Sequence, residues 1–234
     1  MKFINVLERT DHSVDETLIV NEVVSGKVVT FANFFSYLKS RDIDGSYIDR
    51  VYMDGIAGVV LLKIMGIRAK RHSMDYTSIA NPLFSFCIEN SLRLGVVATT
   101  EKLLGSAVDN IIGKYPGLNI GYKRNGFFSD DRQKLDVIRE ICNSHVDVVV
   151  VGMGAPYQDE FCSLLKINGF KGGCITCGGF IEQISGGDEF YPRWVNKLNL
   201  RAFYRMFDKP ELIKRYFLNY PVGAYHLIKD LGGK

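Results

Sequence analysis

Residues 146–160 read VDVVVVGMGAPYQDE, a run of valines followed by Gly152, Met153 and Gly154 and then by Pro156. A strand that is apolar on both faces is typical of a parallel sheet covered by helices. Proline is tolerated in the first turn of a helix, so we expect the chain to pass from strand to helix at Pro156. In open parallel sheets ligands bind at the carboxyl ends of the strands, where these glycines fall. The stretch therefore predicts a fold class and the position of a site.

The same alternation of apolar strands and helices extends over most of the chain. Strands are expected at 28–32, 50–53, 94–98, 119–122, 146–153 and 174–177. Helices are expected at 34–40, 56–65, 76–92, 101–114, 131–144 and 156–167. Strands and helices that alternate at this spacing indicate βαβ units. We therefore expect an α/β fold, a Rossmann-like parallel sheet flanked by helices, with a C-terminal amphipathic helical appendage.

The end of the chain differs from the rest in its charge. The net charge is only +3, but residues 191–234 hold nine Lys or Arg against three Asp or Glu. Aromatic residues are interleaved with these cations, and apolar residues recur at helical spacing after Pro210. The pattern predicts an α/β catalytic domain at 1–190 and a basic, aromatic-rich helical appendage at 191–234. Such an appendage either packs on the sheet domain or contacts an anionic membrane surface.

Composition limits the class of protein further. With 47% hydrophobic residues in 234, the chain can bury a full core. Its N-terminus lacks the apolar stretch of a signal peptide, and its apolar runs fall far short of the roughly 20 residues that a membrane-spanning helix needs. Five cysteines without an export signal are expected to be reduced thiols. These features predict a cytoplasmic protein.

Polar residues follow the predicted strands at the edge where ligands bind. Asp54 ends the second strand, and it is either a catalytic base or the first residue of a common Asp-Gly turn. Thr30 and Asn33 end the first strand, and either of them lines the cleft or caps the next helix. Arg71 and Asp75 stand four apart. They either pair on a helix surface or bind phosphate and sugar hydroxyls.

The turn at 152–154 is open to two interpretations. It would leave backbone N–H groups free for an anion such as a diphosphate. However, the dinucleotide-binding fingerprint needs a third glycine and a later acidic residue, and neither follows, so a packing turn is equally expected. Gln158, one turn into the helix, would reach a base or a sugar hydroxyl, or simply face solvent. Cys174 and Cys177 have metal-binding spacing, but no second pair completes a zinc site. We predict no metal and no cofactor.

Taken in order, these residues resemble the WecG/TagA/CpsF family of bacterial glycosyltransferases. The resemblance covers nearly the whole chain. Its motifs, as they stand here, are Thr30 and Asn33, Asp54-Gly55, Arg71 and Asp75, Tyr115-Pro116-Gly117, Gly126-Phe127-Phe128, Gly152-x-Gly154-x-Pro156-x-Gln158, Gly178-Gly179-Phe180, Tyr204-Arg205, Pro210 and Arg215-Tyr216. So many matches in one order are specific.

The resemblance implies an inverting, metal-independent transferase that moves a sugar from a UDP-sugar to a polyprenyl-diphosphate-linked sugar acceptor. Such an enzyme serves the synthesis of cell-surface polysaccharides such as exopolysaccharide or capsule. Its partners would be the UDP-sugar, the lipid-linked acceptor and an anionic membrane surface at the inner face of the cell membrane, with no nucleic acid among them. The alternative is a non-catalytic subunit of the same fold that binds a nucleotide-sugar or a polyprenyl phosphate.

Carried over residue by residue, the resemblance makes Asp54 the base that takes a proton from the acceptor hydroxyl. A carboxylate is a weak base at neutral pH, so it would act late, as charge develops on the nucleophile. Arg205 and Arg215 would bind a diphosphate, because a planar guanidinium grips phosphate oxygens in pairs. The other expected substrate-binding residues come from the strand ends and the turns after them: Thr30, Asn33, Arg71, Asp75, Gly152, Gly154, Pro156, Gln158, Gly178 and Gly179.

The chain also departs from the family pattern. The family commonly has Lys-Gln-Glu where this chain has Tyr157-Gln158-Asp159, and it has other residues at 190–192 and 201–202. Thr30 and Asn33 stand three apart rather than two, so one of them is not expected to keep the family's contact. The departures argue against N-acetylmannosamine as the donor sugar and leave glucose, uronic acids and other hexosamines open.

Overall fold

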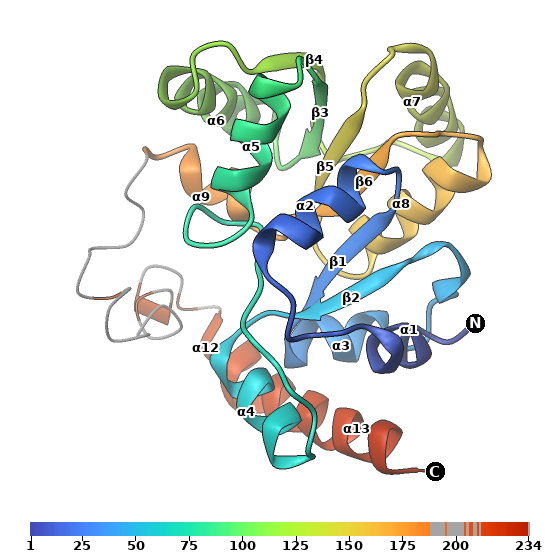
Figure 1. Cartoon of the computed structure of the whole chain (residues 1–234), viewed down its shortest axis with the longest axis vertical. Helices are drawn as coiled ribbons and strands as arrows, with labels where there is room; N and C mark the ends of the chain where they lie inside the picture. Colours follow the sequence, from blue (N-terminus) through green and yellow to red (C-terminus); the bar gives the residue numbers. More distant parts are fainter. Residues whose placement is uncertain (188–194, 196–203, 205, 208–209, 211, 234) are drawn as a thin grey trace.

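Six short strands form one parallel sheet in the order β2-β1-β6-β5-β3-β4 (Figure 1). This computed structural model describes residues 1–187, 195, 204, 206–207, 210 and 212–233. Every pairing between neighbouring strands is parallel. The strands are β1 (Val28–Ala32), β2 (Arg50–Met53), β3 (Arg93–Ala98), β4 (Asn119–Arg124), β5 (Val148–Gly152) and β6 (Gly173–Thr176). The predicted parallel α/β fold is therefore confirmed.

The valine run becomes β5, which lies inside the sheet between β3 and β6. All five of its residues are buried, as expected for a strand that is covered on both faces. Val148 pairs with Leu94 on one side and with Gly173 on the other. The strand is shorter than the predicted range 146–153 because pairing with both neighbours begins only at Val148.

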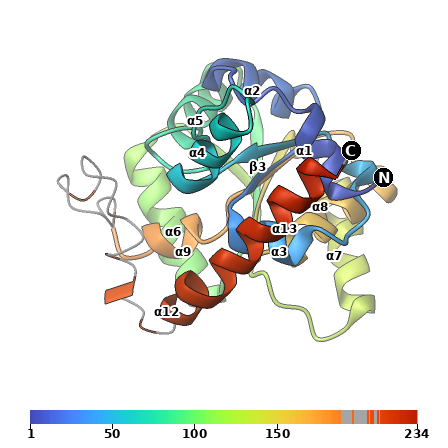
Figure 2. The ribbon, with the colours of Figure 1, turned by 90° about the horizontal axis from the view of Figure 1, so that it is seen from below.

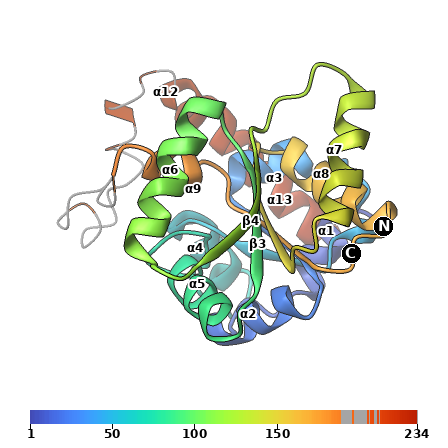
Figure 3. The same ribbon diagram turned by 90° about the horizontal axis from the view of Figure 1, so that it is seen from above.

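Helices cover both faces of the sheet (Figure 3). One face carries α1 (Phe3–Arg9), α3 (Phe34–Ser40), α7 (Asp131–Asn143), α8 (Tyr157–Ile167) and α13 (Tyr220–Gly232). The other face carries α2 (Glu16–Val24), α5 (Ala80–Glu89), α6 (Glu101–Lys114) and α9 (Phe180–Ile184). The remaining named elements are η1 (Gly45–Tyr47), α4 (Ile56–Ile64), α12 (Leu212–Lys214) and the π-helical η2 (Arg215–Asn219).

Side chains of β1 alternate between the two apolar clusters that these helices form. Val28 and Ala32 belong to the cluster with α3 and α8, whereas Val29 and Phe31 belong to the cluster with α2 and α5. Successive residues of a strand point to opposite faces of the sheet, so this alternation follows directly from the sequence. It also decides which residue of β1 reaches the site.

Loop 71–79 corrects the predicted helix at 76–92, which begins only at Ala80. The backbone N–H groups of Ser78 and Ala80 both donate to the carbonyl oxygen of Asp75, and the Thr77 N–H donates to the Asp75 carboxylate. These bonds hold Asp75 in a turn rather than a helix. The helices α1 and α2 at the N-terminus were not predicted, although Asp15 caps α2 by accepting from the Leu18 N–H.

The C-terminal helix α13 packs against α3 (Figure 2). Leu227 is fully buried in the same apolar cluster as Tyr37. Asp230 accepts hydrogen bonds from Tyr37 at 2.6 Å and pairs with Arg41 at 2.9 Å. Part of the predicted appendage at 191–234 is thus bound to the α/β domain, although much of 191–211 lies outside the described residues. Across the described parts of the chain, no helix is long and apolar enough to cross a membrane.

Candidate active site

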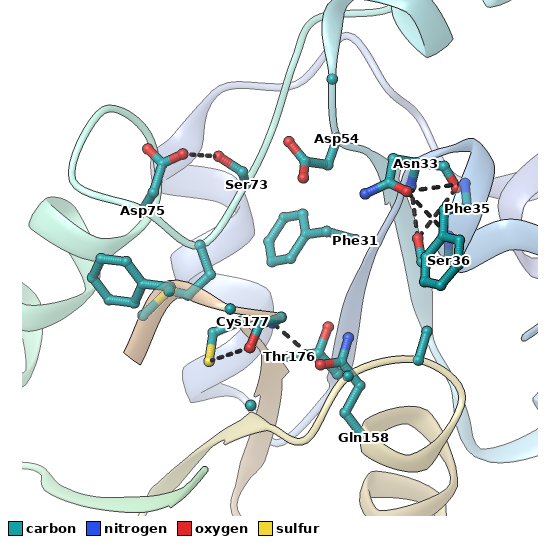
Figure 4. Close-up of a pocket in the computed structure, with 18 of the residues that line it drawn as sticks. Phe31, Asn33, Phe35, Ser36, Asp54, Ser73, Asp75, Gln158, Thr176 and Cys177 are labelled. Carbon is teal, nitrogen blue, oxygen red and sulfur yellow. Dashed lines mark hydrogen bonds between the residues drawn. The ribbon is translucent and has the colours of Figure 1, made fainter. Parts of the chain in front are cut away.

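A cavity of about 1110 Å³ opens at the carboxyl edge of the sheet, where the sequence places the site (Figure 4). Its walls come from the segments that follow β1, β2, β5 and β6, from loop 71–77 and from residues 212–220. Ten of the predicted site residues line it: Asn33, Asp54, Arg71, Asp75, Gly152, Gly154, Gln158, Gly178, Gly179 and Arg215. Segments far apart in the sequence therefore meet at one cavity.

Asp54 projects into this cavity from the end of β2 (Figure 4). Its backbone N–H donates to the Ala32 carbonyl oxygen at 2.7 Å, which continues the pairing of β2 with β1 by one residue. The side chain is 32% exposed, and its Oδ1 lies 3.4 Å from Nε of Arg71. Asp54 is thus held by its backbone at the end of β2, and its carboxylate lines the cavity beside Arg71.

Arg71 lies between two carboxylates. Its Nη2 is 2.6 Å from Oδ2 of Asp75 and 2.5 Å from Oγ of Ser73, while its Nε faces Asp54. Arg71 does pair with Asp75, which was one of the two alternatives, but both residues lie in the loop between α4 and α5 rather than on a helix surface. The ion pair therefore shapes the wall of the cavity, and both residues line that wall.

Asn33 both caps α3 and lines the cavity, the two placements that the sequence left open. Its Oδ1 accepts from the N–H groups of Phe35 and Ser36, each at 3.1 Å. Gln158 is arranged in the same way, since its Oε1 accepts from the Gly178 N–H at 3.2 Å. Bonding each amide through its oxygen leaves its nitrogen, a double donor, for other partners (Figure 4). The site thus contains two positioned amide groups that suit phosphate or sugar oxygens.

Thr30 does not line the cavity, which corrects its expected role at the donor. It is 1% exposed, and its hydroxyl donates to Oδ1 of Asp159 at 2.6 Å. Phe31 lines the cavity in its place, because neighbouring residues of a strand face opposite ways. Phe31 stands two residues before Asn33 and faces the cavity, whereas Thr30 stands three before it and is buried beneath the cavity floor.

Asp159 is the centre of this buried network, and its role could not be inferred from the sequence, where only the Glu that the family commonly has at this position marked it. Its Oδ2 accepts from the Ser40 hydroxyl at 2.6 Å, and Thr176 lies 2.7 Å from Thr30. Burial raises the pKa of Asp159 to about 6, against the opposing hydrogen bonds from Ser40 and Thr30. Because Thr30 has one proton and gives it to Asp159, Thr176 is the donor in their bond. The network joins α3, α8, β1 and β6 beneath the cavity.

Gly152, at the end of β5, and Gly154, just after it, require glycine for different reasons. A Cβ on Gly152 would lie 2.7 Å from Sγ of Cys177, so the close approach of β6 requires glycine there. Gly154 has φ of +75°, and a Cβ there would meet only open space, so its backbone conformation requires glycine. The packing interpretation therefore holds for Gly152, while Gly154 keeps the cavity wall open.

N–H groups at the start of α8 are bonded to residues just before it. The Gln158 N–H already donates to the Gly154 carbonyl oxygen at 3.0 Å, and the Asp159 and Glu160 N–H groups donate to the Pro156 carbonyl oxygen. Pro156 is the residue before the helix and does not line the cavity, a second correction to the expected site.

The C-terminal segment closes the cavity on the side of α3. The guanidinium of Arg215 lies 3.9 Å from the ring centroid of Phe35, and Tyr220 packs edge-on against Phe34 at 5.9 Å. Arg215, Tyr216 and Tyr220 all line the cavity. Burial is the main cause that raises the pKa of Tyr220, which keeps it a neutral hydroxyl. Arg205 lies outside the described residues.

The fold and the site together define the class of protein. A parallel sheet carries, at its carboxyl edge, a cavity lined by three carboxylates, two arginines and three amides, a set suited to a sugar and its phosphates. A family model described as "Glycosyl transferase WecG/TagA/CpsF family" matches residues 7–234. The chain belongs to this family of glycosyltransferases, as its motifs predict.

Curated relatives match over almost the same length. The chain is 35% identical over 228 residues to the UDP-Gal:alpha-D-GlcNAc-diphosphoundecaprenol beta-1,4-galactosyltransferase of Shigella boydii, covering 97% of this chain and 94% of that protein. It is 24% identical over 233 residues to the N-acetylglucosaminyldiphosphoundecaprenol N-acetyl-beta-D-mannosaminyltransferase of Bacillus subtilis strain 168, covering 97% and 86%. Both relatives are transferases named for a diphosphoundecaprenol-linked acceptor.

Proposed function

We propose that this enzyme transfers galactose, with inversion, from UDP-galactose to a polyprenyl-diphosphate-linked N-acetylglucosamine in cell-surface polysaccharide synthesis. The observation that carries the proposal is Asp54, which lies at the end of β2 against Arg71 and lines the cavity. The relative from Shigella boydii supports this donor and this acceptor. Galactose was not among the sugars that the sequence motifs left open.

In the proposed reaction the acceptor hydroxyl attacks the anomeric carbon from the face opposite UDP. The new C–O bond forms as the bond between the anomeric carbon and the diphosphate breaks, and the electron pair of the breaking bond leaves with UDP. Asp54 takes the proton of the acceptor hydroxyl as positive charge develops on the hydroxyl oxygen. Attack on one face and departure from the other convert the α-linked sugar of the donor to a β-linked product.

The side chains around Asp54 supply the remaining functions. The amide nitrogens of Asn33 and Gln158 are donors that suit the donor's phosphate or sugar oxygens, and Arg215 supplies positive charge as negative charge grows on UDP. Arg71 keeps the Asp54 carboxylate in place through its Nε. These roles are consistent with the 1110 Å³ volume of the cavity, which has room for a nucleotide-sugar and part of an acceptor.

The acceptor of such an enzyme is held in a membrane, so we also propose that it works as a peripheral protein at the inner face of the cell membrane. The cations and exposed aromatic residues of the C-terminal segment support this location. Phe217 and Tyr225 are 68% and 61% exposed, and Lys214 and Lys229 lie beside them in the sequence. Basic amphipathic helices of this kind bind anionic lipid surfaces.

A panel of UDP-sugars offered with a short-chain, soluble polyprenyl-diphosphate N-acetylglucosamine tests the proposal. We expect UDP-galactose to be consumed fastest, and Asp54→Asn to lower kcat by about 100-fold or more, because a positioned general base contributes about that factor. Asp136→Asn, on the exposed face of α7, is the matched control and should keep the native rate. Near-native turnover by Asp54→Asn would refute the catalytic assignment, and a chain that binds UDP-sugars without turnover would be a non-catalytic subunit.

A further inference from the structure

One side of α4 presents a row of apolar side chains to solvent. Ile56, Val60 and Ile64 follow one another at intervals of four, which places them on the same side of the helix. They are 47%, 48% and 77% exposed. The opposite side of the helix is core, since Val59 and Leu62 are buried. Single exposed apolar residues are ordinary, but a continuous row indicates a surface that has a partner.

The C-terminal helices carry a second exposed apolar row. Its members, which are all at least 45% exposed, are Ile213, Phe217, Leu218, Val222, Tyr225 and Ile228. Figures 1 and 2 place α4 beside α12 and α13 at one end of the molecule. The two rows belong to elements that also form the cavity, because Ile56 lines one wall and Arg215 and Tyr216 line another. The cavity therefore opens between the two rows.

Cations predominate in the two segments that carry the rows. Segment 56–70 contains Lys63, Arg68 and Lys70, all exposed, and has no acidic residue. In 212–233 the only acidic residue is Asp230, and Arg41 neutralises it. Apolar side chains bordered by cations suit an anionic lipid surface. A second copy of this chain would bring like charges together, which is unfavourable.

We propose that the α4 row docks on an anionic bilayer together with the C-terminal helices, so that the cavity opens at the membrane. Val60 and Ile64 enter the boundary between head groups and acyl chains. The polyprenyl chain of the acceptor can then stay in the lipid while its diphosphate and sugar reach Asp54. This last step rests on the proposed function, whereas the docking of α4 stands on its own exposure and charge.

The test is co-sedimentation with vesicles of phosphatidylcholine and phosphatidylglycerol. The double variant Val60→Gln/Ile64→Gln changes side chains that do not line the cavity. Its matched control is Ile112→Gln/Ile167→Gln, two exposed apolar residues at the ends of α6 and α8, on the opposite edge of the sheet. We expect the α4 variant to partition about tenfold more weakly than the native chain, from the loss of buried apolar area, and the control to partition normally.

Two kinetic measurements complete the test. Turnover of a long-chain acceptor in vesicles should fall with the α4 variant, while turnover of the soluble acceptor should not change. Equal sedimentation of the α4 variant and its control would overturn the docking of α4. If the α4 variant binds vesicles like the native chain but its sedimentation velocity shifts, the α4 row would be assigned to contact with a second copy of the chain. Failure of the native chain to use any UDP-sugar with the soluble acceptor would refute the function and leave the vesicle result intact.

Discussion

Thr30 of β1 shows that the face of a strand on which a residue lies determines its role. Thr30 is a polar residue at a strand end, and the sequence alone cannot tell whether its hydroxyl faces the ligand or the helices behind the sheet. In the fold it faces Asp159 and Ser40, and Phe31 takes the position at the cavity. That successive side chains of β1 alternate between the two faces of the sheet was predictable. Which of them face the cavity depends on which side of the sheet α8 covers. Asp54 needed no such choice, because the end of β2 itself projects at the edge.

Asp159 gives a prediction about pH. Its pKa in the folded chain is about 6, above the ordinary value of 3.8, so the folded chain binds more protons than the unfolded chain between these values. Its contribution to stability is therefore present below pH 4 and is lost as the pH rises to 6. Glu160 lies near and raises the same pKa, while Thr30 and Ser40 lower it.

Urea unfolding of the native chain and of Asp159→Asn at pH 4.5 and pH 7.5 measures this effect. The stability of the native chain relative to the variant should fall by about 2 kcal/mol between the two pH values, because the asparagine does not titrate. The asparagine can still hydrogen-bond both hydroxyls, so the variant should fold. A difference that stays constant with pH would show that Asp159 titrates at its ordinary value.

At the scale of elements, α13 is a helix whose partner the sequence left open. Its apolar spacing and its cations were compatible with packing on the sheet domain or with a membrane contact. In the fold, one side of the helix packs on α3. Gly223 decides the closeness of that contact, since a Cβ there would lie 2.0 Å from the Phe34 carbonyl oxygen. Sequence reasoning cannot locate such a contact, because Phe34 and Gly223 are far apart in the chain. The helix in turn positions η2, which carries Arg215 and Tyr216 to the cavity.

Gly223→Ala should therefore separate α13 from α3. We expect it to cost about 1–3 kcal/mol of stability, as overpacking of a close contact usually does, and to weaken binding of UDP-sugars through the displaced Arg215. Gly232→Ala lies in the same helix with no atom near its Cβ, so it should be neutral or slightly stabilising. Thermal unfolding and donor KM check both variants. Equal behaviour of the two would show that α13 adjusts to the added methyl group without effect.

At the scale of the whole molecule, the six strands could be predicted because most of them are short apolar runs bounded by turn residues. Their order could not, because β3 pairs with β5 across a long sequence separation and nothing local encodes that choice. The motif residues around the cavity were largely predictable from the family pattern. The network under its floor and the loop around Asp75 were not, since both depend on side chains brought together by the fold.

The contact of α13 with the sheet domain separates two roles that a simple truncation would confuse. Deleting residues 220–234 removes Leu227 from the core and leaves Tyr37 and Arg41 without the Asp230 carboxylate. Loss of a buried leucine alone costs about 2–5 kcal/mol, so the shortened chain should unfold at clearly lower urea than the native chain. Its failure to bind vesicles would then reflect unfolding as much as a lost membrane contact. Phe217→Gln/Tyr225→Gln, which changes only exposed side chains, should retain native stability and lose vesicle binding. A truncated chain as stable as the native one would show that α13 is not part of the core.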